Sequence, residues 1–259
     1  IRPTRVIIVF DGKGGSTRRR KIYPQYKQNR RTKYRVNRSN SFASQDDEKQ
    51  NMIMQIQRVV EYLDNLPLTV LSYDNIEADD TIGYICRQVL TDSKITIMST
   101  DKDFLQLANG RIKIWSPTKK KMYDEAAVLD EYGISSHNLI WYRVLDGDKS
   151  DNISGVRGLG LKTIQKKLPF LSENRIVEMD EVVNELPDHK DTIELNYKTY
   201  YLNSGLDLYN LSISYLSPHS SLRQPLFQCH KFFGAQKEFD PDCSLLSIPA
   251  GIDCPQLNV

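Results

Sequence analysis

The sequence lacks the residues that would build disulfides, zinc sites or a membrane span. Its four cysteines are scattered and form no close pair: Cys86, Cys229, Cys243 and Cys254. This pattern argues against a disulfide framework and against a Cys/His zinc site. No apolar run approaches the ~20 residues of a membrane helix, and no signal peptide opens the chain. We therefore expect a reduced, soluble, monomeric protein of the cytoplasm.

The 259 residues are sufficient for one large domain, or for one domain with a smaller appendage. A hydrophobic share of 39% and a charged share of 26% are typical of a globular protein. The net charge of +2 hides a division, because residues 1–38 hold 13 Lys/Arg and one acid, whereas the remainder holds 22 basic and 32 acidic residues. A cationic segment on an acidic body suggests a polyanion held beside a cation site, although a solvated basic loop has the same composition.

Apolar runs alternate with stretches of helical periodicity along the first half of the chain. Strands are predicted at residues 5–10, 68–73, 94–100 and 111–116, and helices at residues 46–66 and 77–90. This alternation predicts an α/β fold with a mainly parallel central sheet flanked by helices.

The other segments are less regular. Residues 18–38 are basic and lack an apolar stripe, so we expect an exposed, mobile excursion. Residues 136–168 contain two helical stretches around a glycine-rich turn, and residues 171–216 are predicted to be helical with breaks. The segment after Pro218 is rich in Ser, Pro, Cys and aromatic residues, with one short helix expected near residues 227–236.

Eight carboxylates occupy positions that a parallel sheet and its helices bring to one rim. Asp11 and Asp101 each follow a predicted strand, and Asp103 lies two residues beyond Asp101. The other five stand at the start of a predicted helix or three residues apart in a turn: Glu77, Asp79, Asp80, Asp148 and Asp151. Capping of a helix or a turn would explain each position singly.

The combination of these carboxylates has a chemical consequence. Two carboxylates about 4 Å apart repel by roughly 4 kcal/mol at an effective dielectric near 20. Eight near one rim would therefore require cations or protons. Hard oxygen ligands suit Mg²⁺, with Mn²⁺ as a substitute, and two such ions can promote the hydrolysis of a phosphodiester.

Three ordered motifs then resemble the 5′-nuclease family, which includes phage 5′-exonucleases (phage ribonuclease H), the 5′-nuclease domain of bacterial DNA polymerase I, and flap endonucleases. The motifs are IEADD at residues 76–80, STDKDF at 99–104 and GDKSDNI at 147–153. GVRGLGLKT at residues 155–163 resembles the family's helix–two-turn–helix element. The resemblance covers residues 5–170, and the three motifs in this order are highly specific.

The resemblance implies a role for each matched residue. The first metal position would be served by Asp11, Glu77, Asp79, Asp80, Asp101 and Asp103, and the second by Asp148 and Asp151. In the basic segment YKQNR, Lys27 would contact the scissile phosphate, Arg30 would steady it and Tyr26 would stack on a terminal base. An ordinary surface tyrosine is the alternative for Tyr26. Lys27, Arg30, Asp11 and Asp101 are thus the expected catalytic residues.

The glycine-rich element is expected to hold one DNA duplex arm. Glycines let backbone amides approach phosphates closely, and the candidates are Gly155, Gly158 and Gly160, with Lys162 and Lys166 adding charge on the next helix. The resemblance also implies a K⁺ ion at this element. A helix hairpin that uses its glycines only for packing is the alternative.

The implied domain plan has one departure from the family. Residues 1–217 would form the nuclease domain, with a basic arch at about 12–45 and the helix–two-turn–helix at about 136–170, and residues 218–259 would be a C-terminal extension. Family members carry a further aspartate on a strand upstream of residues 5–10, which this sequence does not contain. We expect an upstream segment to be missing; a second polypeptide that supplies it and a weakened catalyst are the alternatives.

The expected function is the metal-dependent hydrolysis of phosphodiesters near 5′ ends, in DNA flaps, duplex DNA or RNA–DNA hybrids. Such activity would serve primer removal in replication, in a bacterial or phage-infected cell, with a single-strand binding protein or a clamp as partner. A non-catalytic, structure-specific DNA-binding module and an endoribonuclease of a related acidic-site fold are the competing hypotheses.

Overall fold

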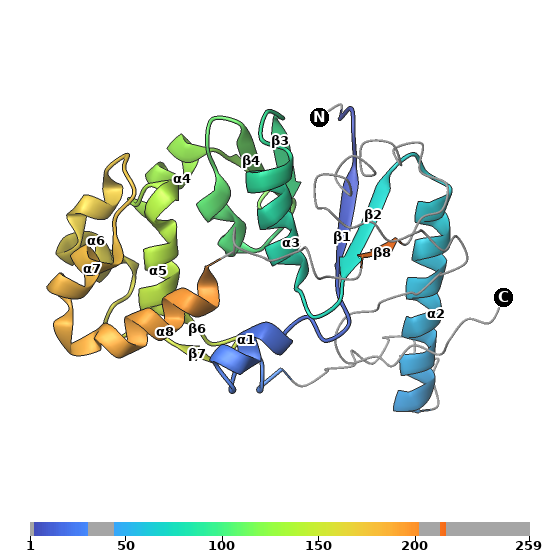
Figure 1. Cartoon of the computed structure of the whole chain (residues 1–259), viewed down its shortest axis with the longest axis horizontal. Helices are drawn as coiled ribbons and strands as arrows, with labels where there is room; N and C mark the ends of the chain where they lie inside the picture. The colour runs from blue at the N-terminus through green and yellow to red at the C-terminus, as the bar shows by residue number, and fades with distance from the viewer. Residues whose placement is uncertain (1–2, 31–43, 202–212, 216–259) are drawn as a thin grey trace. The chain divides into compact units, whose positions relative to one another are not determined.

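A computed structural model describes residues 3–30, 44–201 and 213–215, and the chain divides into two compact units (Figure 1). Unit 1 comprises Ile1–Thr17, Arg31–Thr81 and Leu206–Val259, and unit 2 comprises Arg18–Arg30 and Ile82–Gly205.

Unit 1 contains a three-stranded sheet and one long helix. Its elements are β1 (Ile7–Asp11), α2 (Gln45–Asp64), β2 (Thr69–Tyr73) and β8 (Ile213–Tyr215). Strands β1 and β2 run parallel, with Asp11 opposite Tyr73, and β2 pairs with β8 in the antiparallel sense. Helix α2 begins after Ser44, whose hydroxyl accepts a hydrogen bond from Asp47 N at 3.1 Å. The strands predicted at residues 5–10 and 68–73 and the helix predicted at residues 46–66 are therefore confirmed.

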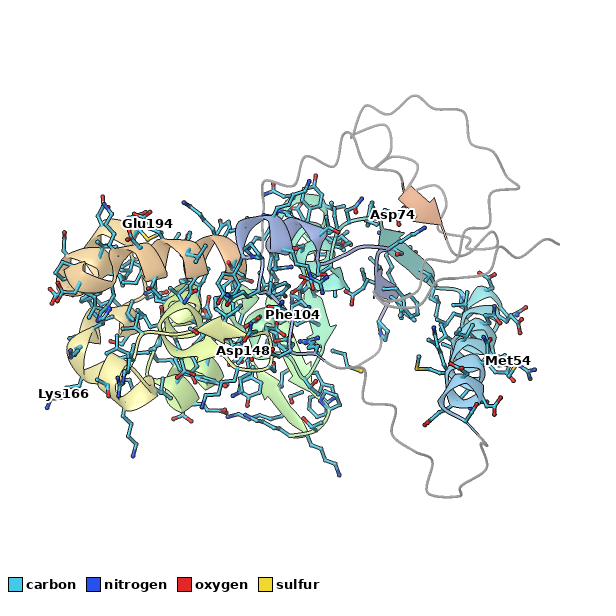
Figure 2. All side chains as sticks on the ribbon, turned by 90° about the horizontal axis from the view of Figure 1, so that it is seen from below. Met54, Asp74, Phe104, Asp148, Lys166 and Glu194 are labelled. Atoms are coloured by element: carbon cyan, nitrogen blue, oxygen red, sulfur yellow. The ribbon has the colours of Figure 1, made fainter. Side chains whose placement is uncertain are left out.

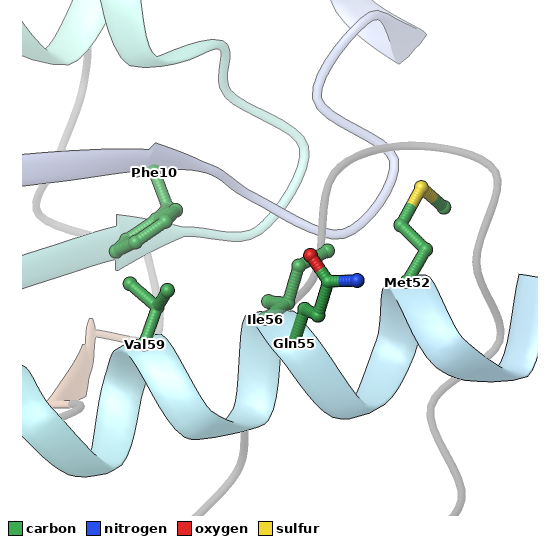
Figure 3. Close-up of a pocket in the computed structure, with 5 residues that line it drawn as sticks. All are labelled: Phe10, Met52, Gln55, Ile56 and Val59. Carbon is green, nitrogen blue, oxygen red and sulfur yellow. The ribbon is translucent and has the colours of Figure 1, made fainter. Parts of the chain in front are cut away.

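Helix α2 and strand β1 leave an apolar groove in unit 1 (Figure 3). Phe10 from β1 lies opposite the side chains that α2 contributes at successive turns, namely Met52, Gln55, Ile56 and Val59. The small core beneath consists of Leu68 and Val70, with Ile8, Phe10 and Leu63 packed against them.

Unit 2 combines a second three-stranded sheet with most of the helices. Its strands are β3 (Ile95–Met98), β4 (Ile112–Ser116), β5 (Lys121–Tyr123), β6 (Gly147–Asp148) and β7 (Ile153–Ser154). Its helices are α1 (Thr17–Ile22, of which only the first residue belongs to unit 1), α4 (Glu125–Tyr132), α5 (Leu139–Asp146), α6 (Leu161–Lys167), α7 (Met179–Glu185) and α8 (Lys190–Tyr200). Helix α3 (Ala78–Tyr84) crosses from unit 1 into unit 2 and continues as a π-helical turn, Ile85–Val89. Strand β3 pairs with β4 in parallel, and β4 pairs with β5 in the antiparallel sense.

The core of unit 2 centres on helix α5, which is buried along most of its length. Trp141 is only 2% exposed, and its ring N–H donates to Val177 O at 3.1 Å. Asn196 on α8 donates to Val144 O and to Ser154 O, both at 2.9 Å. Helix α8 is therefore fastened both to α5 and to the short strand that follows the acidic turn at residues 148–151.

Two predictions about the fold need correction and one is not confirmed. Residues 18–30 were expected to be exposed, but α1 and the turns after it bury Arg19 and Tyr26; residues 31–43 lie outside the described part. Residues 171–216 were expected to be helical with breaks; helices α7 and α8 confirm this up to Tyr200, but Ile213–Tyr215 form a strand. The single, mainly parallel sheet is not confirmed, because the described strands form two three-stranded sheets, each with one antiparallel pair, and a two-stranded one. The helix expected near residues 227–236 lies outside the described residues.

No helix within the described ranges has both the length and the apolar character to cross a membrane.

An ion network joins strand β5 to helix α4 and gives a prediction for stability. Glu131 accepts from Lys119 Nζ, Lys121 Nζ and the Tyr123 hydroxyl at 2.8, 2.8 and 2.7 Å. Partial burial alone would raise the pKa of Glu131, but these three donors outweigh it and lower that pKa to about 2. A carboxyl group with a lowered pKa stabilises the fold at pH values above its unfolded pKa of 4.5. This stabilisation is lost as the pH falls towards 2.

Glu131→Gln is therefore expected to lower the free energy of unfolding at pH 7 by about 1–2 kcal/mol, a figure reduced for screening by solvent. The difference from the parent protein should narrow as the pH falls below 4.5, the ordinary value for this carboxyl. Urea unfolding at pH 7, 5 and 3.5 measures it. A difference that stays constant across this range would contradict the ionic explanation.

Candidate functional site: two carboxylate clusters and a basic segment

Three carboxylates meet in unit 1 at the start of helix α3. Glu77, Asp79 and Asp80 each present an oxygen, and these oxygens all lie within 4.8 Å of one another. Glu77 and Asp80 are 4% and 2% exposed. Carboxylates at this spacing repel one another, and their hard oxygen donors suit a divalent cation.

The backbone brings Asp11 to the same helix end. Asp11 ends strand β1, and its Oδ1 accepts a hydrogen bond from Ala78 N at 2.8 Å. The next residue, Gly12, passes so close to β2 that an added Cβ would lie 1.6 Å from Tyr73 O. Only glycine allows this approach, which turns the chain across the strand ends and places Asp11 beside residues 77–80. This hydrogen bond satisfies the first backbone amide of α3 and does not exclude a role for Asp11 as a metal ligand.

A second group of carboxylates lies in unit 2. Asp101 follows strand β3 and caps the 3-10 helix Lys102–Leu107, accepting from Asp103 N at 2.9 Å. Asp148 follows helix α5 and closes the next turn, where its Oδ1 accepts from Ser150 N at 2.7 Å and from Ser150 Oγ at 2.6 Å. Two motifs about 45 residues apart in the sequence thus supply neighbouring carboxylates.

Arg143 on helix α5 lies between these carboxylates, and the sequence analysis did not identify it. Its Nε donates to Asp103 Oδ1 at 2.5 Å and its Nη2 donates to Asp148 Oδ2 at 2.7 Å. The guanidinium also stacks on Tyr200, with Cζ 5.2 Å from the ring centroid. A buried arginine in the apolar run LIWYRVLD is the signal that would have pointed to it, because a buried charge needs a partner.

The electrostatics of the cluster follow from burial and charge. Burial raises the pKa of Asp103 to about 6; the charges of Asp101 and Asp148 add to the rise, and Arg143 opposes it. Burial also works against the ionised form of Asp148, but the bonds from Ser150 and Arg143 outweigh it and lower the pKa of Asp148. Both oxygens of Asp148 already accept hydrogen bonds, so a metal at the predicted second position would have to share this carboxylate with Arg143 or displace it.

The basic segment YKQNR packs on the acidic turn within unit 2. Lys27 N donates to Asp151 O at 2.8 Å, and the Arg30 guanidinium pairs with the Asp151 carboxylate. The two predicted phosphate-binding residues therefore lie next to one of the two carboxylates predicted for the second metal position.

Tyr26 differs from the expectation of a surface ring. Its side chain is 3% exposed and belongs to the core of unit 2, and Lys27 Nζ lies 4.9 Å from its ring centroid. The surface alternative is therefore wrong. Stacking on a terminal base stays a prediction that requires this segment to rearrange.

The three candidate glycines are not equivalent. A Cβ on Gly155 would lie 2.2 Å from Asp146 O, whereas Cβ atoms on Gly158 and Gly160 would meet nothing within 4 Å. The packing alternative thus accounts for Gly155, and Gly158 and Gly160 leave open backbone. Lys162 and Lys166 on α6 are exposed, and Figure 2 shows Lys166 projecting outward.

The predicted site residues thus fall into two groups. Unit 1 brings together Asp11, Glu77, Asp79 and Asp80. Unit 2 brings together Asp101, Asp103 and Asp148, and joins Asp151 to Lys27 and Arg30. The glycine-rich turn and Lys162 and Lys166 also belong to unit 2.

The fold and these clusters define a class, namely mixed α/β proteins with oxygen-rich sites suited to divalent cations. Residues 1–133 match the family model described as "5′-3′ exonuclease, N-terminal resolvase-like domain". The chain is 31% identical over 212 residues to a 5′-3′ exonuclease of Aquifex aeolicus, covering 80% of this chain and 68% of that protein. The chain therefore belongs to the 5′-3′ exonuclease family of nucleases.

Other relatives agree but are longer. A 5′-3′ exonuclease of Buchnera aphidicola is 34% identical over 61% of this chain, which spans half of that protein. A DNA polymerase I of Caldicellulosiruptor bescii is 29% identical over 82% of this chain, which spans 23% of the polymerase.

Solved structures share the fold. A bacteriophage T5 5′-exonuclease with bound zinc has a TM-score of 0.59 at 20% identity. A T5 flap endonuclease with DNA and metal ions has a TM-score of 0.59 at 22% identity. In each case the match covers 77% of this chain and 74% of the other.

Proposed function

We propose that this chain is a divalent-metal-dependent, structure-specific 5′-nuclease that hydrolyses phosphodiesters near the 5′ ends of DNA flaps, duplex DNA or RNA–DNA hybrids. The observation that carries the proposal is the group of carboxylate oxygens from Glu77, Asp79 and Asp80 within 4.8 Å of one another, in a chain of the 5′-3′ exonuclease family. Primer removal in replication is the proposed role.

The residues present fit a cation of the Mg²⁺ class. Glu77, Asp79 and Asp80 offer hard oxygen donors, and no His or Cys is part of this group. The proposal comprises two Mg²⁺ ions, with Mn²⁺ as a substitute, and a K⁺ ion at the glycine-rich turn. When bound, divalent ions supply the charge that makes water more acidic and stabilises the phosphate oxygens during displacement.

The chain's own residues would bind and orient the substrate. Lys27 would offset phosphate charge, and Arg30 would grip two phosphate oxygens with its fork of donors. Arg30 pairs with Asp151 in this structure, so binding a phosphate would require exchanging a carboxylate for it. Open backbone at Gly158 and Gly160, with the exposed Lys162 and Lys166, would hold one duplex arm without reading bases. In a living cell the partners would be replication proteins, a single-strand binding protein or a clamp.

A labelled 5′-flap duplex tests the proposal directly. The chain is incubated with the duplex in Mg²⁺, in Mn²⁺ and in EDTA, beside a blunt duplex, an RNA–DNA hybrid and unstructured RNA of equal length. Cleavage near the flap junction that requires the divalent ion supports the proposal. Preference for the unstructured RNA would favour an endoribonuclease.

A non-catalytic DNA-binding module is the second candidate, and one observation favours it. Arg143 pairs with Asp103 and Asp148, and Arg30 pairs with Asp151; these two positive charges offset part of the negative charge and lower the demand for metal in unit 2. Tight, flap-specific binding without cleavage in any divalent ion would support this candidate over the nuclease.

The role of the helix α6 lysines gives a further prediction. Lys162→Ala should weaken duplex binding uniformly across sequences and reduce the slope of log K against log salt by about one. Fluorescence anisotropy at four salt concentrations measures it. Lys190→Ala is the matched control, because Lys190 begins helix α8 and already pairs with Glu194 at 3.8 Å. Equal slopes for the parent and Lys162→Ala would remove Lys162 from the interface.

A further inference from the structure

Asn152 links the basic segment at residues 25–30 to the acidic turn at residues 148–151, and all of these residues belong to unit 2. Its Nδ2 donates to Gln25 O at 2.9 Å, and its Oδ1 accepts from Asn29 Nδ2 at 2.7 Å. One side chain thus bonds to residues 25 and 29, on either side of Lys27.

Lys27 and Asn152 both have a left-handed backbone conformation, which residues other than glycine disfavour. Lys27 has φ of 55° and Asn152 has φ of 61°. Asparagine tolerates this left-handed region, whereas a lysine there costs about 1 kcal/mol and persists only where its surroundings hold it. Lys27 N donates to Asp151 O at 2.8 Å, so the residue next to Asn152 supplies part of that restraint.

These contacts determine where Lys27 and Arg30 lie relative to the carboxylates of the acidic turn. Lys27 and Arg30 are the proposed phosphate-binding residues, and Asp148 and Asp151 are proposed ligands in the turn that Asn152 ends. We propose that Asn152 is a positioning residue, which holds Lys27 and Arg30 in register with the carboxylates of this turn. The inference rests on the proposed nuclease function, because it assigns a role relative to the same site.

The physical reason is the sensitivity of catalysis to placement. A displacement of about 1 Å of a group that acts on the reacting atoms can cost up to ~100-fold in rate. Tyr26 packs in the core of unit 2, but Gln25, Asn29 and Arg30 are exposed, so core packing does not replace the contacts of Asn152 at these three residues. Losing Asn152 should therefore loosen the segment without unfolding unit 2.

Asn152→Gly is the decisive variant, because glycine accepts the φ of 61° at this position and lacks the side chain that makes the two bonds. Hydrogen exchange of the parent and the variant is compared for the peptides that cover residues 25–30 and helix α6. We expect faster exchange in residues 25–30 and unchanged exchange in α6. Unchanged exchange in residues 25–30 would overturn the link, and faster exchange in both would indicate general opening and overturn it as well.

Single-turnover cleavage of the flap duplex, over a range of enzyme concentrations, then separates rate from binding. Asn152→Gly should lower the maximal rate by ~10-fold or more and leave the half-saturating concentration unchanged. Asn152→Asp retains the acceptor for Asn29 but loses the donor to Gln25 O, and it should also lower the maximal rate. A loss confined to binding would overturn the positioning role.

Failure of the proposed function has a different signature. If the parent chain cleaves no substrate in Mg²⁺ or Mn²⁺, the nuclease proposal fails and the positioning role fails with it. The exchange experiment still decides whether Asn152 holds the segment.

Discussion

Asp101→Asn is expected to lower the single-turnover rate of flap cleavage by ~100-fold or more, and to leave duplex affinity and folding unchanged. Asparagine keeps the oxygen that accepts from Asp103 N at 2.9 Å, so the cap of the following 3-10 helix survives. It removes one negative charge from a cluster whose proposed task is to hold a divalent cation. Measurement of cleavage, duplex affinity and melting temperature on the same preparation separates these effects.

Asp124→Asn is the matched control for this change. Asp124 caps helix α4 by accepting from Ala127 N at 3.1 Å, and its side chain lies in the same unit, outside both carboxylate clusters. The same substitution in the same structural role should leave cleavage unchanged. Equal losses of cutting and binding in Asp101→Asn, or a comparable loss in Asp124→Asn, would make Asp101 a structural residue.

Asp148→Asn is a poorer test of the same idea, and the reason is geometric. Asp148 accepts from Ser150 with one oxygen and from Arg143 with the other. An amide there would turn a donor towards one of those donors, so the variant would lose folding energy together with charge. A loss of activity in Asp148→Asn would therefore leave the two causes mixed.

The parts of the fold that the sequence predicted correctly are those with a strong periodic signal. The apolar runs before Asp11 and before Asp101 became strands β1 and β3, and the helical spacing in residues 46–66 became α2. The end of a strand is visible in a sequence because hydrophobicity stops there. The carboxylates that follow these strands were therefore predictable as candidates.

Contacts between distant segments were not predictable in the same way. Nothing in residues 18–30 shows an apolar stripe, yet Arg19 donates to Thr199 O at 2.9 Å and Tyr26 enters the core. Such burial depends on which distant segment supplies a partner, and a single sequence does not encode that locally. Arg143 was missed for a related reason, because helical periodicity places it on a buried face without showing which charges meet it.

The glycine-rich turn shows how structure divides a motif that the sequence presents as one unit. The three glycines are candidates for the same role because each allows close backbone approach. In the structure, Gly155 meets backbone atoms of residues 145 and 146, and Gly160 faces open space. The packing role falls to Gly155 and the proposed phosphate-binding role is left to Gly158 and Gly160, so substitution at each position distinguishes the two roles.

Gly155→Ala is expected to destabilise unit 2 by about 3 kcal/mol or more. The added Cβ would lie 2.2 Å from Asp146 O and 2.5 Å from Leu145 O, both backbone atoms that no rotamer change can move. Gly160→Ala meets nothing within 4 Å and should cost at most about 1 kcal/mol, for the change at the start of helix α6. Gly158→Ala, at φ of 82°, should cost about 1–2 kcal/mol.

Urea unfolding of the three variants gives the order directly, and an equal cost at Gly155 and Gly160 would contradict the packing account. The loss of duplex affinity should follow the opposite order among the folded variants, with the largest loss in Gly160→Ala. A methyl group at Gly160 stands where the backbone is open to a phosphate, so Gly160→Ala should weaken binding while its stability is nearly that of the parent. Because the folding effect and the binding effect fall on different residues of one turn, neither can be explained as a by-product of the other.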